Sequence, residues 1–223
     1  MKINSVLMTA FGAGSLALLS SSMNAANAAS TSFSMNQFTG SNAEVNYTLE
    51  DIAGGGVKFT VDASSQLSDI RGVWFDISDD SLLSGLNILG NDITQTVIDA
   101  NSVNNLGGGV NLNGGGTSAP FDVGLEIGQS GLRGGRDDFR MTTFNVFHDS
   151  VALSIENFAG QDFGTRLTSV GANRNGSSKL VGMAPTGNNP PSVPEPLPGG
   201  MATTMSLLAI GGAFKVMSSK KRA

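Results

Sequence analysis

Short segments in which apolar residues alternate with polar or small ones recur along the middle of this chain. The pattern is clearest over residues 43–49, 57–61 and 121–127. Because successive side chains of a β-strand point to opposite faces, this period of two predicts half-buried strands in antiparallel sheets. Clusters of Gly, Asn, Asp and Ser, which turns favour, separate nearly all of these segments.

Further strands are predicted where apolar residues are denser. These are residues 73–77, expected in the centre of a sheet, and residues 139–147, 151–155 and 163–170. Seven or more short strands at regular spacing predict an all-β fold, a single antiparallel β-sandwich of jelly-roll or immunoglobulin-like type. Trp74 stands in a strongly apolar run, so we expect it in the core rather than on a sugar-binding surface.

Two stretches of the middle region depart from the strand pattern. Residues 82–100 are ambiguous, because their leucines at 82, 83, 86 and 89 could also line a short helix. Residues 104–116 are of low complexity, with two Gly triplets on either side of a Val-Asn-Leu-Asn unit. This composition predicts a flexible surface loop, either for recognition or as a plain linker.

Composition narrows how such a domain is stabilised and what it binds. The chain has 223 residues and no Cys, so disulfides and Cys-ligated zinc are excluded and the core itself must hold the domain together. Residues 29–185 contain 17 acidic and 8 basic residues. We expect no nucleic-acid partner, because phosphates require clustered Lys and Arg.

The N-terminus has the three parts of a secretory signal. Lys2 precedes an apolar run over residues 6–19, and Ala26-Asn27-Ala28 fits the A-x-A pattern of signal peptidase. The run is shorter than the roughly 20 residues that a membrane span prefers. We therefore predict a signal helix within residues 1–28, handled by the export machinery and removed by signal peptidase.

The C-terminus combines a stiff linker, an apolar helix and a basic end. A Pro/Asn-rich linker over residues 186–193 leads to Pro194, Glu195 and Pro196, and residues 199–217 form the predicted short transmembrane helix. The helix is followed by basic residues, which tend to stop it in a membrane with the charged end in the cytoplasm. The predicted membrane-stop residues are Lys215, Lys220, Lys221 and Arg222, the basic end proper being residues 220–222.

The order of these elements over residues 194–223 resembles the PEP-CTERM sorting signal of bacterial surface proteins. The resemblance implies that an exosortase-type transpeptidase processes the tail near Pro194-Glu195-Pro196 while the helix holds the chain in the membrane. The alternative is a permanent anchor after a Pro-rich hinge. Residues 69–76, 121–128 and 163–171 are also similar to cyanobacterial PEP-CTERM ectodomains of unassigned function. This likeness implies an extracellular β domain over residues 29–185, and the tail implies association with exopolysaccharide.

Residues that could carry catalysis are few. His148 is the only histidine, and in His148-Asp149-Ser150 neighbouring side chains of a strand would point to opposite faces, which works against a catalytic relay. We expect His148 at the surface, at the end of a strand. Arg133, Arg136 and Arg140 indicate either a charge network at a turn or a contact to an anion or glycan.

Two groups of acidic residues offer the oxygen ligands that calcium prefers. The first is Asp76, Asp79 and Asp80 after the 73–77 strand, and the second is Asp137 with Asp138. The same residues favour turns, which is the competing interpretation. Calcium is the single cofactor considered, because zinc and transition metals require more His or Cys than the chain has.

The leading hypothesis is therefore an exported envelope or extracellular-matrix protein without enzymatic activity, whose β-sandwich is a structural or interaction module. A glycan-binding module, assisted by calcium, is the alternative. A secreted hydrolase is the third, and it requires two carboxylates about 5–10 Å apart in a cleft.

Overall fold

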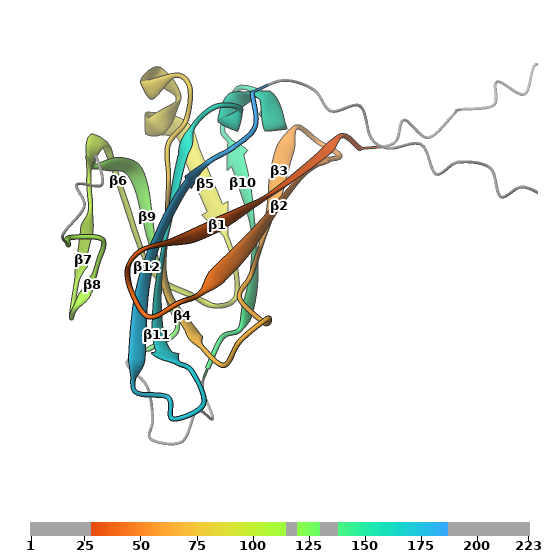
Figure 1. Ribbon diagram of the computed structural model, residues 1–223. Helices are drawn as coiled ribbons and strands as arrows, with labels where there is room; N and C mark the ends of the chain where they lie inside the picture. Colours follow the sequence, from red (N-terminus) through yellow and green to blue (C-terminus); the bar gives the residue numbers. More distant parts are fainter. Residues whose placement is uncertain (1–27, 115–119, 130–137, 187–223) are drawn as a thin grey trace, which may run out of the picture. The chain divides into compact units, whose positions relative to one another are not determined.

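A computed structural model describes residues 28–114, 120–129 and 138–186 of the chain. Strands dominate these ranges, with two short 3₁₀ helices among them (Figure 1). The elements are β1 Ser30–Gly40, β2 Glu44–Ile52, β3 Gly56–Asp62, β4 Asp69–Phe75, η1 Asp80–Gly85, β5 Leu86–Leu89, β6 Ile93–Val103, β7 Asn105–Gly107, β8 Val110–Asn111, β9 Phe121–Ile127, β10 Met141–His148, η2 Ile155–Phe158, β11 Asp162–Val170 and β12 Gly176–Met183. The prediction of an all-β fold is confirmed.

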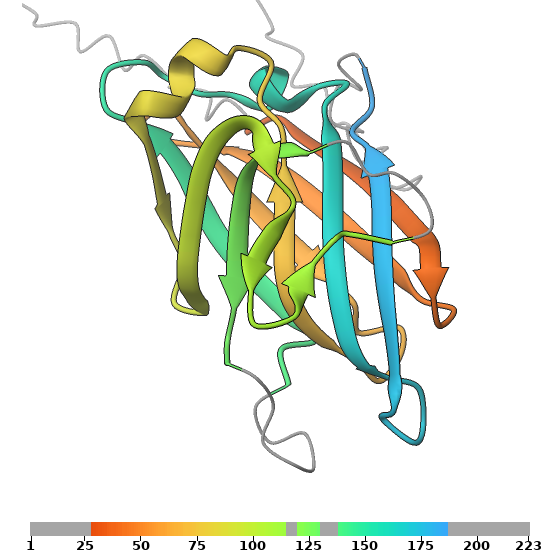
Figure 2. The same cartoon turned by 90° about the vertical axis from the view of Figure 1, so that its left-hand side faces the viewer.

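Ten of the strands form one antiparallel sheet in the order β5-β10-β3-β2-β1-β12-β11-β4-β9-β6. The sheet curls until it is nearly closed, so that its two halves face each other (Figures 1 and 2). β1 joins the halves, since residues Ser30 to Asn36 pair with β2 and Asn36 to Gly40 pair with β12. The assignment to the jelly-roll or immunoglobulin type stays a prediction.

Aromatic rings from both halves of the sheet fill the space between them. Phe59 of β3 lies with its ring centroid 5.1 Å from that of Phe75 of β4, and 4.9 Å from that of Phe144 of β10. The buried Tyr47 hydroxyl bonds to Thr165 Oγ1 at 2.6 Å across the same interior. The inner core therefore connects strands that are distant in both sequence and sheet order.

The structure confirms most of the predicted strands and corrects one. Residues 43–49, 57–61, 73–77, 121–127, 139–147 and 163–170 correspond to β2, β3, β4, β9, β10 and β11. The predicted strand over 151–155 is wrong. Leu153 and Ile155 are buried, but the Leu153 N–H donates to Gly55 O at 3.0 Å and the Ile155 N–H to Asp51 Oδ1 at 2.7 Å. The segment crosses strand ends instead of joining the sheet, and η2 begins at Ile155.

The ambiguous stretch 82–100 contains both kinds of structure. Leu82 and Leu83 lie on the 3₁₀ helix η1, whereas Leu86 and Leu89 bound the short edge strand β5. β5 and β6 are the two edge strands of the sheet and follow each other in the chain. Because β5 pairs with β10 and β6 pairs with β9, the two strands separate after the turn that joins them. A shallow groove of about 540 Å³ lies at this divergence.

No helix in the described ranges is long and apolar enough to cross a membrane. The predicted signal helix and C-terminal helix lie outside the described residues.

Candidate functional site

Three glycines on the outer face of β4, β9 and β11 surround the only tryptophan. Trp74 has Gly164 of β11 and Gly124 of β9 as its register partners. A methyl group at Gly124 would lie 2.7 Å from Leu106, and one at Gly72 would lie 2.8 Å from Val110. The missing side chains therefore let the indole and a covering segment lie directly on the sheet.

The covering segment, residues 104–114, contains β7 and β8 and is called the strap here (Figure 2). Its apolar residues pack with Trp74 in a second hydrophobic cluster, separate from the inner core, formed by Trp74, Val103, Leu106, Val110, Leu112 and Phe121. The prediction of a flexible surface loop over residues 104–116 is wrong for residues 105–112, which form a hairpin that the Val-Asn-Leu-Asn unit anchors, while residues 115 and 116 lie outside the described ranges. Its first Gly triplet makes the turn between β7 and β8 with positive φ at Gly107, Gly108 and Gly109.

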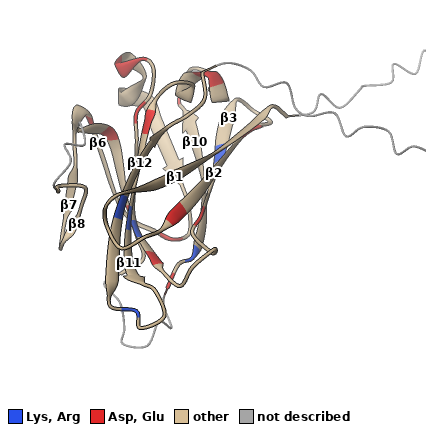
Figure 3. Cartoon of the chain, in the orientation of Figure 1, with Lys and Arg blue, Asp and Glu red and all other residues tan. Residues whose placement is uncertain are grey.

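β11 and β12 each carry one basic residue at paired positions, and one of the two contacts the strap. Figure 3 shows the Lys and Arg positions in blue. Arg166 and Lys179, the basic pair, are register partners on these strands. Lys179 Nζ donates to Asn111 Oδ1 of the strap at 2.8 Å, and Arg166 Nη1 lies 3.4 Å from Ser178 O. Arg166 Nε is buried and has no hydrogen-bond partner among the described residues.

Burial shapes the electrostatics of the basic pair. It lowers the pKa of Arg166, and burial together with the charge of Arg166 lowers the pKa of Lys179. The ion pairs of the described residues are Lys58–Glu50, Arg71–Glu126 and Arg174–Asp138. No carboxylate in those ranges therefore neutralises the basic pair, which makes it a candidate anion site. No sequence pattern predicted this site, since only the strand register brings the two residues together.

A cluster of carboxylates lies at the other end of β4. Asp76 Oδ1 accepts the N–H of Asp122 at 2.9 Å. Asp122 is only 2% exposed, and its two oxygens accept the N–H groups of Ile77 at 3.0 Å and Asn101 at 2.8 Å. These bonds tie the ends of β4, β6 and β9 together. A hydrolytic base or nucleophile at Asp122 would have to give them up.

The acidity of Asp76 differs strongly from that of an ordinary carboxyl group. Burial raises its pKa to about 7, the N–H of Asp122 opposes the shift, and the charges of Asp122, Asp162 and Asp80 add to it. A carboxyl group that titrates near neutrality can serve as a general acid. Hydrolysis would need a second carboxylate as base or nucleophile. In this cluster both oxygens of Asp122 already accept backbone N–H groups.

The predicted calcium ligands that the structure describes each have hydrogen-bond or ion-pair partners. Asp79 caps η1 by accepting the Ser81 N–H at 2.9 Å, and Asp80 Oδ2 accepts from Asn101 Nδ2 at 3.1 Å. Asp138 pairs with Arg174, and Asp137 lies outside the described residues. Within the described ranges no three His, Cys, Asp or Glu residues are arranged to hold a metal ion. Asp79 is the cap of η1 and Asp80 cross-links η1 to β6, and calcium binding stays a prediction.

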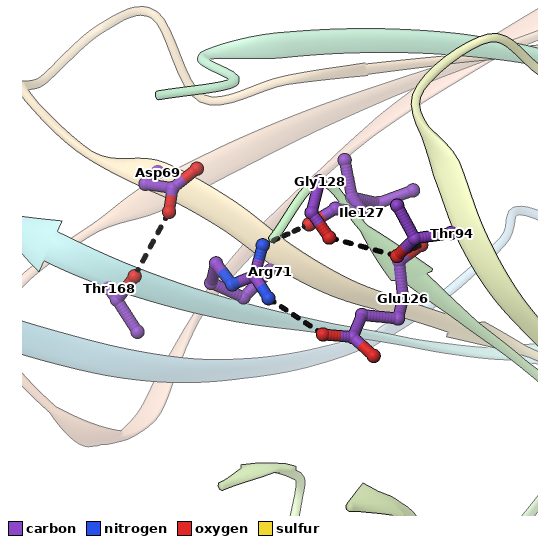
Figure 4. Close-up of polar contacts among 7 residues, drawn as sticks. All are labelled: Asp69, Arg71, Thr94, Glu126, Ile127, Gly128 and Thr168. Atoms are coloured by element: carbon purple, nitrogen blue, oxygen red, sulfur yellow. Dashed lines mark hydrogen bonds and ion pairs between the residues drawn. The ribbon is translucent and has the colours of Figure 1, made fainter. Parts of the chain in front are cut away.

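A buried arginine organises the start of β4 (Figure 4). Arg71 binds the carbonyl of Ile127 and pairs with Glu126 Oε1 at 2.7 Å. Asp69 nearby accepts the N–H of Phe139 at 3.0 Å and the hydroxyl of Thr168 at 3.3 Å. These contacts join β4 to β9, to β11 and to the segment before β10. Alternation in the sequence did not reveal them, because it does not show where a buried charge finds its partner.

The remaining predicted residues divide between described and undescribed parts of the chain. His148 is the last residue of β10, as predicted, and its Nδ1 accepts the N–H groups of Ser150 at 3.1 Å and Val151 at 3.2 Å. Arg140 donates to Ser64 O, and the exposed Ala28 lies just before β1. The residues outside the described ranges are Ala26, Arg133, Arg136, Pro194, Glu195, Pro196, Lys215, Lys220, Lys221 and Arg222.

Function must therefore be argued from the residues of this chain. Comparisons with protein-family models, with curated proteins and with solved structures gave no match.

Proposed function

We propose that the chain is an exported envelope or extracellular-matrix protein of the PEP-CTERM type. Its β domain, a sandwich of the jelly-roll or immunoglobulin kind, is a structural and interaction module without enzymatic activity. One observation carries the proposal: buried charged side chains cross-link the strands of a domain that has no cysteine. Asp69, Arg71 and Asp122 are almost fully buried, and each binds the backbone of an element distant in sequence.

Cross-links of this kind suit a domain that must survive outside the cell without disulfides. A buried hydrogen bond to a charged group contributes about 1.5–3 kcal/mol, and removal of one partner leaves the other unsatisfied. Asp122 alone fixes two N–H groups, those of Ile77 and Asn101. These carboxylates hold the fold together, and that role supports a structural module.

The limits of the β domain support the proposed export and sorting. β1 begins at Ser30, two residues after the proposed cleavage site at Ala28, and β12 ends at Met183, shortly before the linker 186–193. Removal of residues 1–28 and processing of the tail 194–223 would leave intact every strand that the described ranges contain. The export machinery, signal peptidase and an exosortase-type transpeptidase are therefore the partners that we propose for the two ends.

Cell fractionation with surface proteolysis tests the location. We expect the chain in the envelope or matrix fraction of its host, sensitive to protease added to intact cells. A triple variant, P194A/E195A/P196A, should remain in the membrane fraction, while E156Q, an exposed Glu-to-Gln change outside the tail sequence, should behave like the wild type. A cytoplasmic, protease-protected wild-type chain would remove the basis of the proposal.

The basic pair favours glycan binding as a second candidate function. Trp74 and Tyr47 are both 0% exposed and cannot stack on a sugar, so recognition would use charge and hydrogen bonds. A glycan array with and without a chelator tests this candidate. Binding to acidic glycans that persists in the chelator is the expected result. Binding that the chelator abolishes would favour the calcium-assisted form, and a silent array at high protein concentration would count against glycan binding.

A further inference from the structure

We propose that Arg166 and Lys179, together with Asn111 of the strap, form a binding site for an oxyanion, a carboxylate or sulfate group such as an acidic polysaccharide carries. The site deepens the proposed interaction function and rests on it for its biological setting. Its chemistry can be tested on the protein alone.

The basic pair is an arrangement that a sheet does not favour by itself. Arg166 and Lys179 are direct cross-strand neighbours, and like charges placed opposite each other destabilise a sheet. Both side chains are half-buried, so water screens their repulsion less than it would at an exposed site. A bound anion would remove the repulsion.

The nearest acidic residue along the same row of the sheet is already engaged. Glu126 of β9 is the register partner of Gly72 of β4, which in turn is the register partner of Arg166. Two strand spacings of about 4.8 Å place the backbones of Glu126 and Arg166 about 10 Å apart. Glu126 is bound to Arg71 at 2.7 Å, so its charge is compensated there.

The donors of the basic pair suit an oxyanion. Guanidinium and ammonium groups form short, charge-assisted hydrogen bonds to carboxylate and sulfate oxygens. Lys179 Nζ is held at Asn111 by one bond of 2.8 Å and retains further donors. The only hydrogen bond of the Arg166 guanidinium is the 3.4 Å contact with Ser178 O, and its Nε has no acceptor among the described residues.

The surroundings indicate that the basic pair holds one oxyanion group at a time. Acidic residues exceed basic ones by 17 to 8 over residues 29–185, so the domain as a whole repels the densely spaced phosphates of nucleic acids. Next to the basic pair lie uncharged hydrogen-bonding groups, the Asn111 amide and the Thr39 hydroxyl, and Thr39 is the register partner of Lys179. Sugar hydroxyls are natural partners for such groups, which is why we expect the oxyanion on a polysaccharide.

Calorimetric titration of the full chain tests the proposal with three probes: sodium sulfate, an alginate oligosaccharide and a neutral dextran oligosaccharide, all at equal ionic strength. We expect the wild type to bind sulfate weakly, alginate oligosaccharide more tightly, and dextran not at all. The double variant R166Q/K179Q should lose at least about tenfold in affinity for the first two probes, because it lacks the charge-assisted bonds. K58Q, which removes a half-exposed cation bound to Glu50 instead, should change neither affinity.

Each outcome is informative. The site is supported if the wild type binds sulfate and alginate and the double variant loses both. If alginate binds more tightly than sulfate, the natural ligand is an oxyanion carried by a polymer. Sulfate binding alone would assign it to a free oxyanion and overturn the polysaccharide part. Absence of both, or equal affinity in the double variant, overturns the site. Thermal unfolding provides the folding control, since the double variant should be at least as stable as the wild type at low salt. The cell fractionation tests the proposed export and does not depend on anion binding, so a failure of one proposal can be told from a failure of the other.

Discussion

The two faces of β4 are both apolar, but they are built in different ways. Val73 and Phe75 point into the inner core, where rings from β3, β10 and β11 meet them. Trp74 points outward onto a surface of glycines and is covered by one strap. The inner face depends on large side chains from all around the curled sheet. The outer face depends on the absence of side chains, so a gain of one methyl group destabilises it, whereas the inner face is destabilised by a loss.

The largest effect is expected from a change at the centre of the inner face. F59A removes a ring that lies within 6.1 Å, centroid to centroid, of Phe75, Phe144, Phe158 and Phe163. It should lower the free energy of unfolding by about 3–5 kcal/mol, because the surrounding rings cannot refill the cavity. Chemical denaturation measures this. F33A, at a half-buried ring, is the matched control and should cost clearly less.

The strap should contribute less, and locally. L112A removes a fully buried side chain of the outer cluster and should cost about 2–4 kcal/mol. Native-state hydrogen exchange should show faster exchange in the strap, with the inner strands β2 and β3 still protected. Uniform loss of protection in both regions would show that the two faces unfold as one unit, and the comparison would no longer hold.

Gly164 tests the claim that the outer face requires empty positions. A methyl group there would overlap Leu112 and press on the ring of Phe121. G164A should therefore cost about 1–3 kcal/mol by overpacking. In a double-mutant cycle the cost should shrink when Leu112 is already Ala, because the clashing methyl is gone. Additive costs in the cycle would contradict the contact.

The smallest effect concerns the acidic end of β4, and it depends on pH. Burial raises the pKa of Asp76 from 3.8 to about 7, so the native state holds this proton more tightly than the unfolded chain. The resulting stabilisation is full below about pH 4 and is lost as the pH rises through 7. Because the side chain is half-exposed, we expect a loss of about 1–2 kcal/mol rather than the full value of the shift.

The variant D76N isolates this contribution, since its amide oxygen can still accept the Asp122 N–H seen at 2.9 Å. Urea unfolding at pH 4 and pH 8 should show D76N gaining stability over the wild type at the higher pH. D149N, at an exposed aspartate, is the control. Its free energy of unfolding should differ between pH 4 and pH 8 as that of the wild type does. A constant gap between D76N and the wild type would refute the raised pKa.

Alternation in the sequence predicted β2 and β3, whose two faces differ in burial, and also β9, which is buried on both faces. β2, with buried Val45, Tyr47 and Leu49 between more exposed residues, was easily recognised. β1 and β12 were missed, because each has a single strongly buried apolar residue, Met35 and Leu180, among Ser, Thr, Asn and Gly. The edge strand β6 was missed for the related reason that most of its residues are exposed.

The candidate site was beyond the reach of sequence alone. Arg166 and Lys179 are separated by a turn, and they become neighbours only through the register of β11 with β12. Asp76, Asp79 and Asp80, by contrast, are close in sequence but bind different partners in the structure. Residues that are close along the chain need not form one site, because each polar side chain can bind a different backbone N–H or amide group nearby.

Intact mass of the chain recovered from its host's envelope and medium tests the central claim most directly. The account predicts a mass that lacks residues 1–28 and the segment after Pro194-Glu195-Pro196, which leaves the β domain and linker. A mass that retains both ends would contradict export and sorting together. A mass that lacks only residues 1–28 would keep export and turn the tail, with Lys220, Lys221 and Arg222, into a permanent anchor.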